Sequence, residues 1–144
     1  MLNLTRRTEY ALIGLAHLAA QSPGTVVNVR EIADQHNMPG KLVAKVFHEL
    51  KTAGMLKSHQ GKKGGYSLAR DPHALNLSEV LMAIEGKAAL VRCVDGNGAD
   101  CPQYDECIIS DPLRALHERI KVLFDSMTIS DFVSNKSSVG AFEP

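Results

Sequence analysis

The chain has 144 residues and carries 16 basic and 16 acidic side chains, so its formal net charge is zero. Hydrophobic residues make up 44% of the sequence, yet no apolar run approaches the roughly 20 residues that a membrane helix needs, which excludes a membrane protein. We expect a cytoplasmic protein with one small domain, or a small domain with an appended oligomerisation element.

Two helices are predicted near the N-terminus. Apolar residues recur at helical spacing over residues 8–21, and Thr5 or Thr8 is available to cap that helix. Asn28, followed three residues later by Glu31, has the pattern of a capping box that begins a short second helix.

A third helix is predicted over residues 41–53, after the turn at residues 37–40, and Gly54 is suited to end it. Its apolar side chains lie on one face: Leu42, Val43, Val46, Phe47 and Leu50. Two short helices joined by a four-residue turn are typical of a helix-turn-helix unit.

Two strand-like runs, residues 55–58 and 66–69, flank a loop rich in glycine and lysine. A helix-turn-helix followed by such a hairpin is a winged helix. The fold class expected is therefore mainly α, with a small β-hairpin wing.

Further helices follow the predicted wing. Asn76 and Glu79 form a second capping-box pattern, and Gly86 ends that helix. Asp111 and Pro112 then predict the cap and first residue of a long helix. Its apolar stripe consists of Leu113, Leu116, Ile120, Leu123 and Phe124. A helix this apolar on one face requires a partner, so we interpret it as a dimerisation helix.

These predictions divide the chain into four parts. They are a winged helix-turn-helix domain (1–86), a cysteine loop (87–110), a dimerisation helix with a short terminal helix (111–134) and a flexible tail (135–144).

The zero net charge hides an uneven distribution. Residues 41–70 contain seven Lys or Arg and one acid, whereas residues 93–119 contain six acids and two arginines. A basic surface is what binding to double-stranded DNA requires. The candidate DNA-binding residues are Gly40, Lys41, Ala44, Lys45 and His48 in the recognition helix, with Lys62 and Lys63 in the wing. The alternative is a solvated helix face and a solubilising hairpin.

The three cysteines, Cys93, Cys101 and Cys107, are separated by seven and then five residues. This spacing is too wide for the close cysteine pairs of a zinc knuckle, and thiolates are the favoured ligands of iron–sulfur clusters. Buried free cysteines or a zinc site remain as alternatives. The possible fourth ligands are Glu9, Asp105, Glu106, His117 or a group from a second subunit.

Several segments together resemble the bacterial winged-helix iron–sulfur regulators that include NsrR and IscR. In chain order they are Thr8–Leu12, Leu50–Gly54, Gly61–Tyr66, Leu77–Val80, Ile84–Gly86, the three cysteines and Thr128–Asp131. The resemblance covers nearly the whole chain up to about Val133.

The resemblance implies a homodimer in which Cys93, Cys101 and Cys107 hold an iron–sulfur cluster, with four irons favoured over two. IscR-like members use a histidine three residues after the last cysteine, but Ser110 stands there. NsrR-like members use an acidic residue from the first helix of the other subunit, and Glu9 matches that place. The chain is therefore similar to the nitric-oxide-sensing branch.

The function expected is that of a transcriptional repressor whose affinity for its DNA operator depends on the cluster. The cluster in turn would sense nitric oxide, redox state or iron supply. The alternative is a regulator without a cluster that uses cysteine thiols or zinc. An enzyme is not expected, because the sequence has no Cys-x-x-Cys, no nucleotide-binding loop and no paired nucleophile and base.

Overall fold

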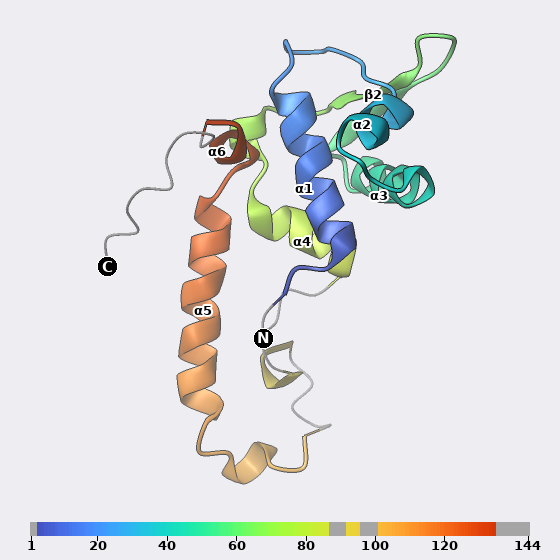
Figure 1. Ribbon diagram of the computed structural model, residues 1–144. Helices are drawn as coiled ribbons and strands as arrows, with labels where there is room; N and C mark the ends of the chain where they lie inside the picture. The colour runs from blue at the N-terminus through green and yellow to red at the C-terminus, as the bar shows by residue number, and fades with distance from the viewer. Residues whose placement is uncertain (1–2, 87–91, 96–100, 135–144) are drawn as a thin grey trace.

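The computed structural model describes residues 3–86, 92–95 and 101–134, and it shows a mainly helical chain with one antiparallel hairpin (Figure 1). The fold class predicted from the sequence is confirmed. The elements are α1 (Arg6–Ala19), α2 (Val29–Gln35), α3 (Gly40–Thr52), β1 (Leu56–His59), β2 (Gly65–Leu68), η1 (Pro72–Ala74), α4 (Leu77–Glu85), η2 (Arg92–Asp95), η4 (Tyr104–Glu106), α5 (Ser110–Ser126) and α6 (Ile129–Ser134).

The core forms where α1 packs on α3, α4 and α6. Phe47 of α3 is fully buried at its centre and meets the ring of Tyr66 edge-on, with 5.4 Å between the ring centroids. A Cβ at Gly14 of α1 would collide with the Phe47 ring, so glycine allows the two helices to approach closely. Burying a side chain of this size stabilises the fold by about 3 kcal/mol.

The hairpin pairs Leu56 with Leu68 at its open end and His59 with Gly65 near the loop. Each strand lies one residue from its predicted position. Val27, in the loop before α2, adds a further backbone bridge to Tyr66 through two N–H···O bonds of 2.9 Å. This bridge joins the wing to the helix-turn-helix.

Local capping signals place most of the helix ends correctly. Thr5 caps α1, and Asn76 and Glu79 form the predicted capping box of α4. Gly86 ends α4 in the left-handed conformation, with φ of 70°. Asn28 caps α2 by accepting the N–H of the second helical residue rather than the third, so the reciprocal box predicted there is not formed.

The start of α5 differs from the prediction. The helix begins at Ser110 with Ile109 as its N-cap, and no side chain caps it, so Asp111 and Pro112 lie inside the first turn. Helix α5 contacts α4 and η2 and extends away from the core (Figure 1). Its only buried residue is His117.

After α5 the chain returns to the core. The N–H of Leu77 donates to the carbonyl of Met127, and the N–H of Ile129 donates to the carbonyl of Leu75, each at 2.8 Å. Ile129 of α6 is fully buried among core residues. Among the residues that the structure describes, none of the helices has the length and hydrophobicity required to cross a bilayer.

Candidate DNA-binding face and cysteine segment

Helix α3 has one buried and one exposed face. Val43, Val46, Phe47 and Leu50 have no exposed surface. The predicted contact residues Gly40, Lys41, Ala44, Lys45 and His48 are all exposed. Because a helix repeats every 3.6 residues, this separation leaves a continuous polar stripe free to meet DNA.

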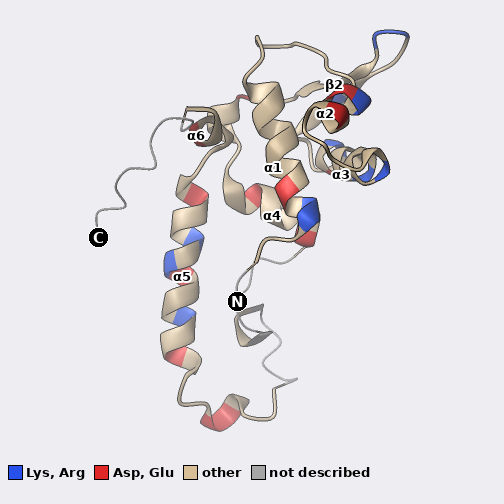
Figure 2. Ribbon diagram, in the orientation of Figure 1, with Lys and Arg blue, Asp and Glu red and all other residues tan. Residues whose placement is uncertain are grey.

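Lys62 and Lys63 are also exposed, at the tip of the loop between β1 and β2. Figure 2 shows basic residues on α3 and at this wing tip. Gly61 adopts φ of 106°, and a Cβ at Gly64 would lie 2.7 Å from the carbonyl oxygen of His59, so the tight turn depends on glycine at both positions. The exposed basic residues thus occur on two neighbouring elements, the arrangement expected of a winged-helix DNA reader.

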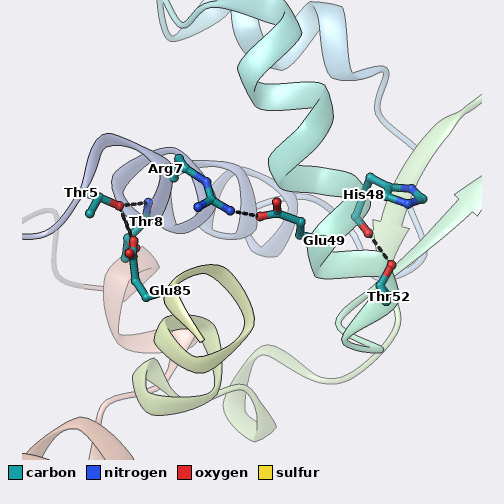
Figure 3. A network of polar contacts seen from close by, with 7 residues as sticks. All are labelled: Thr5, Arg7, Thr8, His48, Glu49, Thr52 and Glu85. Carbon is teal, nitrogen blue, oxygen red and sulfur yellow. Dashed lines mark hydrogen bonds and ion pairs between the residues drawn. The ribbon is translucent and has the colours of Figure 1, made fainter. Parts of the chain in front are cut away.

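The single acid of α3, Glu49, is paired across the fold. Arg7 of α1 donates to it at 2.6 Å, and both side chains are partly buried (Figure 3). Because Glu49 pairs with Arg7, it does not pair with Lys41 or Lys45 on the exposed stripe of α3. No local pattern predicts this contact, because the two residues are 42 positions apart.

The first turn of α1 also binds the end of α4. Thr8 donates its hydroxyl to Glu85 at 2.6 Å, and Thr5 donates to the same oxygen (Figure 3). These hydrogen bonds, from Thr5 first and Thr8 second, hold the pKa of Glu85 below its ordinary value because they favour the ionised carboxylate. The first turn of α1 is therefore tied to both α3 and α4.

The cysteines lie between α4 and α5. Cys93 is in η2, Cys107 follows η4, Cys101 precedes η4, and all three thiols are half-buried. The predicted cysteine loop also includes residues 87–91 and 96–100, which lie outside the described residues. Within the part that is described, no three His, Cys, Asp or Glu side chains gather closely enough to hold a metal ion. Three thiols match an iron–sulfur cluster in chemistry, although the described residues do not bring them together.

The predicted fourth ligands lie in different places. Glu9 is partly exposed on α1 and forms an ion pair with Arg6 at 2.8 Å. Asp105 and Glu106 are exposed in η4. His117 is buried in α5, and its Nδ1 has no hydrogen-bond partner among the described residues. Sequence reasoning named His117 as a ligand candidate but not as a buried residue.

Comparison with known proteins gives a consistent result. The model of the Rrf2 family, described as an iron-dependent transcriptional regulator, matches residues 4–135. The regulator NsrR of Bacillus subtilis is 30% identical over 138 residues, which are 96% of this chain and 94% of NsrR. A putative regulator of Mycobacterium tuberculosis is 30% identical over 90% of this chain and 80% of its own length.

Solved structures show the same fold. CymR, the global cysteine regulator of B. subtilis, superposes with a TM-score of 0.77 at 23% identity, covering 95% of this chain and all of CymR. IscR of T. potens superposes with a TM-score of 0.69 at 20% identity, covering 96% of this chain and 94% of IscR.

Proposed function

Because the chain belongs to the Rrf2 family of transcriptional regulators, we propose that it represses transcription by binding operator DNA through α3 and the wing. We further propose that an iron–sulfur cluster on Cys93, Cys101 and Cys107 sets its affinity for that DNA. The relatives are named as transcriptional regulators, so an enzymatic role is unsupported.

One observation carries the DNA-binding proposal: α3 buries one face completely and exposes lysines on the other. Lys41 and Lys45 are one helical turn apart on that exposed face. The lysines of the wing are exposed as well, and Figure 2 shows basic residues both on α3 and at the wing tip. A duplex held by this surface would have its phosphates neutralised by both elements.

A salt titration tests this surface. The probe is a duplex selected from a random library by the wild-type protein. Lys45→Ala should weaken binding and reduce the slope of log affinity against log salt by about 1, because one phosphate contact is lost. The matched control is Lys121→Ala, an exposed lysine on α5. Equal slopes in both variants would exclude Lys45 as a phosphate contact.

The cluster proposal rests on the ligand chemistry and on the family description. Three half-buried thiols follow one another within a short segment, and the matching family is described as iron-dependent. When bound, a cluster would supply an iron centre that reacts with nitric oxide or responds to redox state and iron supply. The thiols of Cys93, Cys101 and Cys107 would hold it, and their partial burial would limit its contact with water.

Glu9 from the other subunit of a homodimer is the fourth ligand that we propose. Its side chain lies at the surface of α1, where a second copy of the chain can reach it. The Arg6–Glu9 pair is an exposed ion pair worth about 0–1 kcal/mol, so Glu9 can leave Arg6 at little cost. A carboxylate is a harder ligand than a thiolate, which makes its iron the most exchangeable position.

The experiment is purification without oxygen, followed by visible absorption and analysis of iron and acid-labile sulfide. Wild-type protein should contain both, lose its colour with nitric oxide, and reveal by iron content whether the cluster has four irons or two. Cys101→Ala should lack the cluster. Unchanged iron and sulfide in that variant would refute the ligand assignment.

A second candidate is a regulator that uses its thiols directly or binds zinc. Direct use of the thiols is favoured by the arrangement in the described residues, where no three potential metal ligands gather. A colourless protein that lacks iron and still binds DNA would support it, and zinc without sulfide would identify the metal form.

A further inference from the structure

The first turn of α1 makes side-chain contacts with two other helices, α4 and α3. Thr5 and Thr8 donate hydrogen bonds to Glu85 of α4. Arg7 pairs with Glu49 of α3 at 2.6 Å. Figure 3 shows Glu49 and Glu85 beside the single turn of α1 that carries their three partners.

The side chains that make these contacts are partly or fully buried. Thr8 has no exposed surface, and its hydroxyl lies 2.6 Å from the Glu85 carboxylate. Arg7 and Glu49 are partly buried, and the Nε of Arg7 is fully buried. Hydrogen bonds to ionised groups are stronger than neutral ones, and partial burial reduces their screening by water. The first turn of α1 therefore moves together with its partners on α3 and α4.

The two ends of this network adjoin the two proposed sites. Glu85 is the last residue of α4, and the predicted cysteine loop begins at residue 87. Glu49 directly follows His48, a candidate DNA contact. The hydroxyl of Thr52 donates to the carbonyl of His48 at 3.0 Å, which stabilises the same turn of α3.

We propose that Arg7 and Glu85 are positioning residues that transmit the state of the cysteine segment to the recognition helix. This inference rests on the proposed function, and it assigns the route of regulation between its two sites. A change in the cysteine segment shifts the end of α4, and Glu85 transfers that shift to Thr5 and Thr8. Because α1 is a rigid helix, Arg7 moves with them and displaces Glu49.

Glu9, the fourth ligand that we propose, lies next to this network. It directly follows Thr8 in the turn that binds both partners. Ligation of Glu9 in the other subunit would pull on this turn. The same network thus receives the signal from either side, from its own cysteine segment or from the second copy.

The first test compares DNA affinity in cluster-loaded protein and in protein freed of metal by a chelator. Allosteric couplings typically change affinity by about 5- to 150-fold. Glu85→Gln and Arg7→Gln should reduce the ratio between the two states to below about twofold. Glu79→Gln is the matched control, because Glu79 lies on the same helix and pairs with Arg70 instead of α1. It should retain the wild-type ratio.

Two further readouts separate positioning from other roles. Iron, sulfide and melting temperature should remain at wild-type values in Glu85→Gln, which excludes loss of the cluster or of the fold. The salt slope should be unchanged in Arg7→Gln, because a residue that acts through Glu49 does not bind phosphate. A wild-type affinity ratio in Glu85→Gln would overturn the proposal, whereas a wild-type protein without iron would overturn only the proposed cluster.

A second test needs no cluster. In metal-free protein, Glu85→Gln should change DNA affinity by about threefold or more, as coupled residues do. The same change should have less than about 1.5-fold effect in a Glu49→Gln background, because the link from α1 to α3 is then already broken. Additive effects of the two substitutions would overturn the route.

Discussion

Helices α3 and α5 show how differently the two parts of this molecule are stabilised. Four residues of α3 have no exposed surface, whereas α5 buries only His117. Leu116 and Leu123 of α5 remain 47% and 40% exposed although they belong to its apolar stripe. The winged helix is completed by its own chain, but α5 has an apolar surface that a second copy can cover.

The two parts are nevertheless connected by α6. Its residue Ile129 is fully buried, and α6 packs against α1 and η1. A segment that follows α5 in the sequence therefore completes the core of the winged helix. The winged helix therefore depends on residues that lie beyond the cysteine segment.

The largest effect on stability is expected at Phe47. Phe47→Ala should reduce the free energy of unfolding by about 3–5 kcal/mol, because the ring fills the space above Gly14 and a cavity would remain. Urea unfolding measures the loss. Met82→Ala, at a half-exposed position of α4, should cost less than about 0.5 kcal/mol. Equal costs would mean that the core is not centred on Phe47.

The next effect concerns assembly instead of folding. Leu116→Asp should raise the dissociation constant of the dimer at least about 30-fold, because it places a charge in the apolar interface that we propose. Sedimentation at several protein concentrations measures it. Arg114→Asp puts the same acid at an exposed polar position of α5 and should leave the dimer intact. If both variants sediment like the wild-type protein, the stripe is not the interface.

The same division explains how much of the fold could be predicted. Helix ends were predicted where the signal is local, as at Asn76 and Gly86, whose backbone roles depend on nearby residues. The predicted start of α5 was wrong: Asp111 and Pro112 form a strong local pattern, yet the helix begins two residues before Pro112, at Ser110. The bridge from Val27 to Tyr66 gave no local signal, since it joins distant segments.

The candidate site divides in the same way. The exposed face of α3 could be predicted, because helical periodicity alone separates Lys45 from Val46. The pairing of Arg7 with Glu49 could not, because it depends on how α1 crosses α3. The cysteines could be identified by residue type, but their spacing does not encode where the chain places them relative to one another.

A smaller effect is expected at Asn76, where the winged helix meets the segment before α6. Asn76→Ala should destabilise the protein by about 1 kcal/mol, because the Oδ1 that accepts the partly buried N–H of Glu79 is lost. Asn28→Ala removes a cap with a single bond and should cost less. Urea unfolding of the two variants provides the comparison, and a larger loss at Asn28 would contradict it.

The smallest effect is a pH dependence within the winged helix, at the contact between His17 of α1 and His36 after α2. Their ring nitrogens lie 2.9 Å apart. Burial, and secondarily the charge of His36, hold the pKa of His17 below its ordinary 6.5, so the folded state resists its protonation. Above pH 6.5 this contribution to stability is complete. As the pH falls below 6.5 the unfolded chain binds the proton first, and stability is lost until the pH reaches the lowered pKa.

The loss should be smaller than about 1 kcal/mol, because the pair is only partly buried. Urea unfolding at pH 7.5 and 5.5 measures it, and His17→Gln should remove this part of the pH dependence. Because α5 is not involved, Leu116→Asp should retain it at a concentration where both proteins are compared as monomers. The same pH dependence in His17→Gln as in the wild type would assign the titration to other groups, whereas its loss in Leu116→Asp would show that the second copy contributes to the α1–α2 contact.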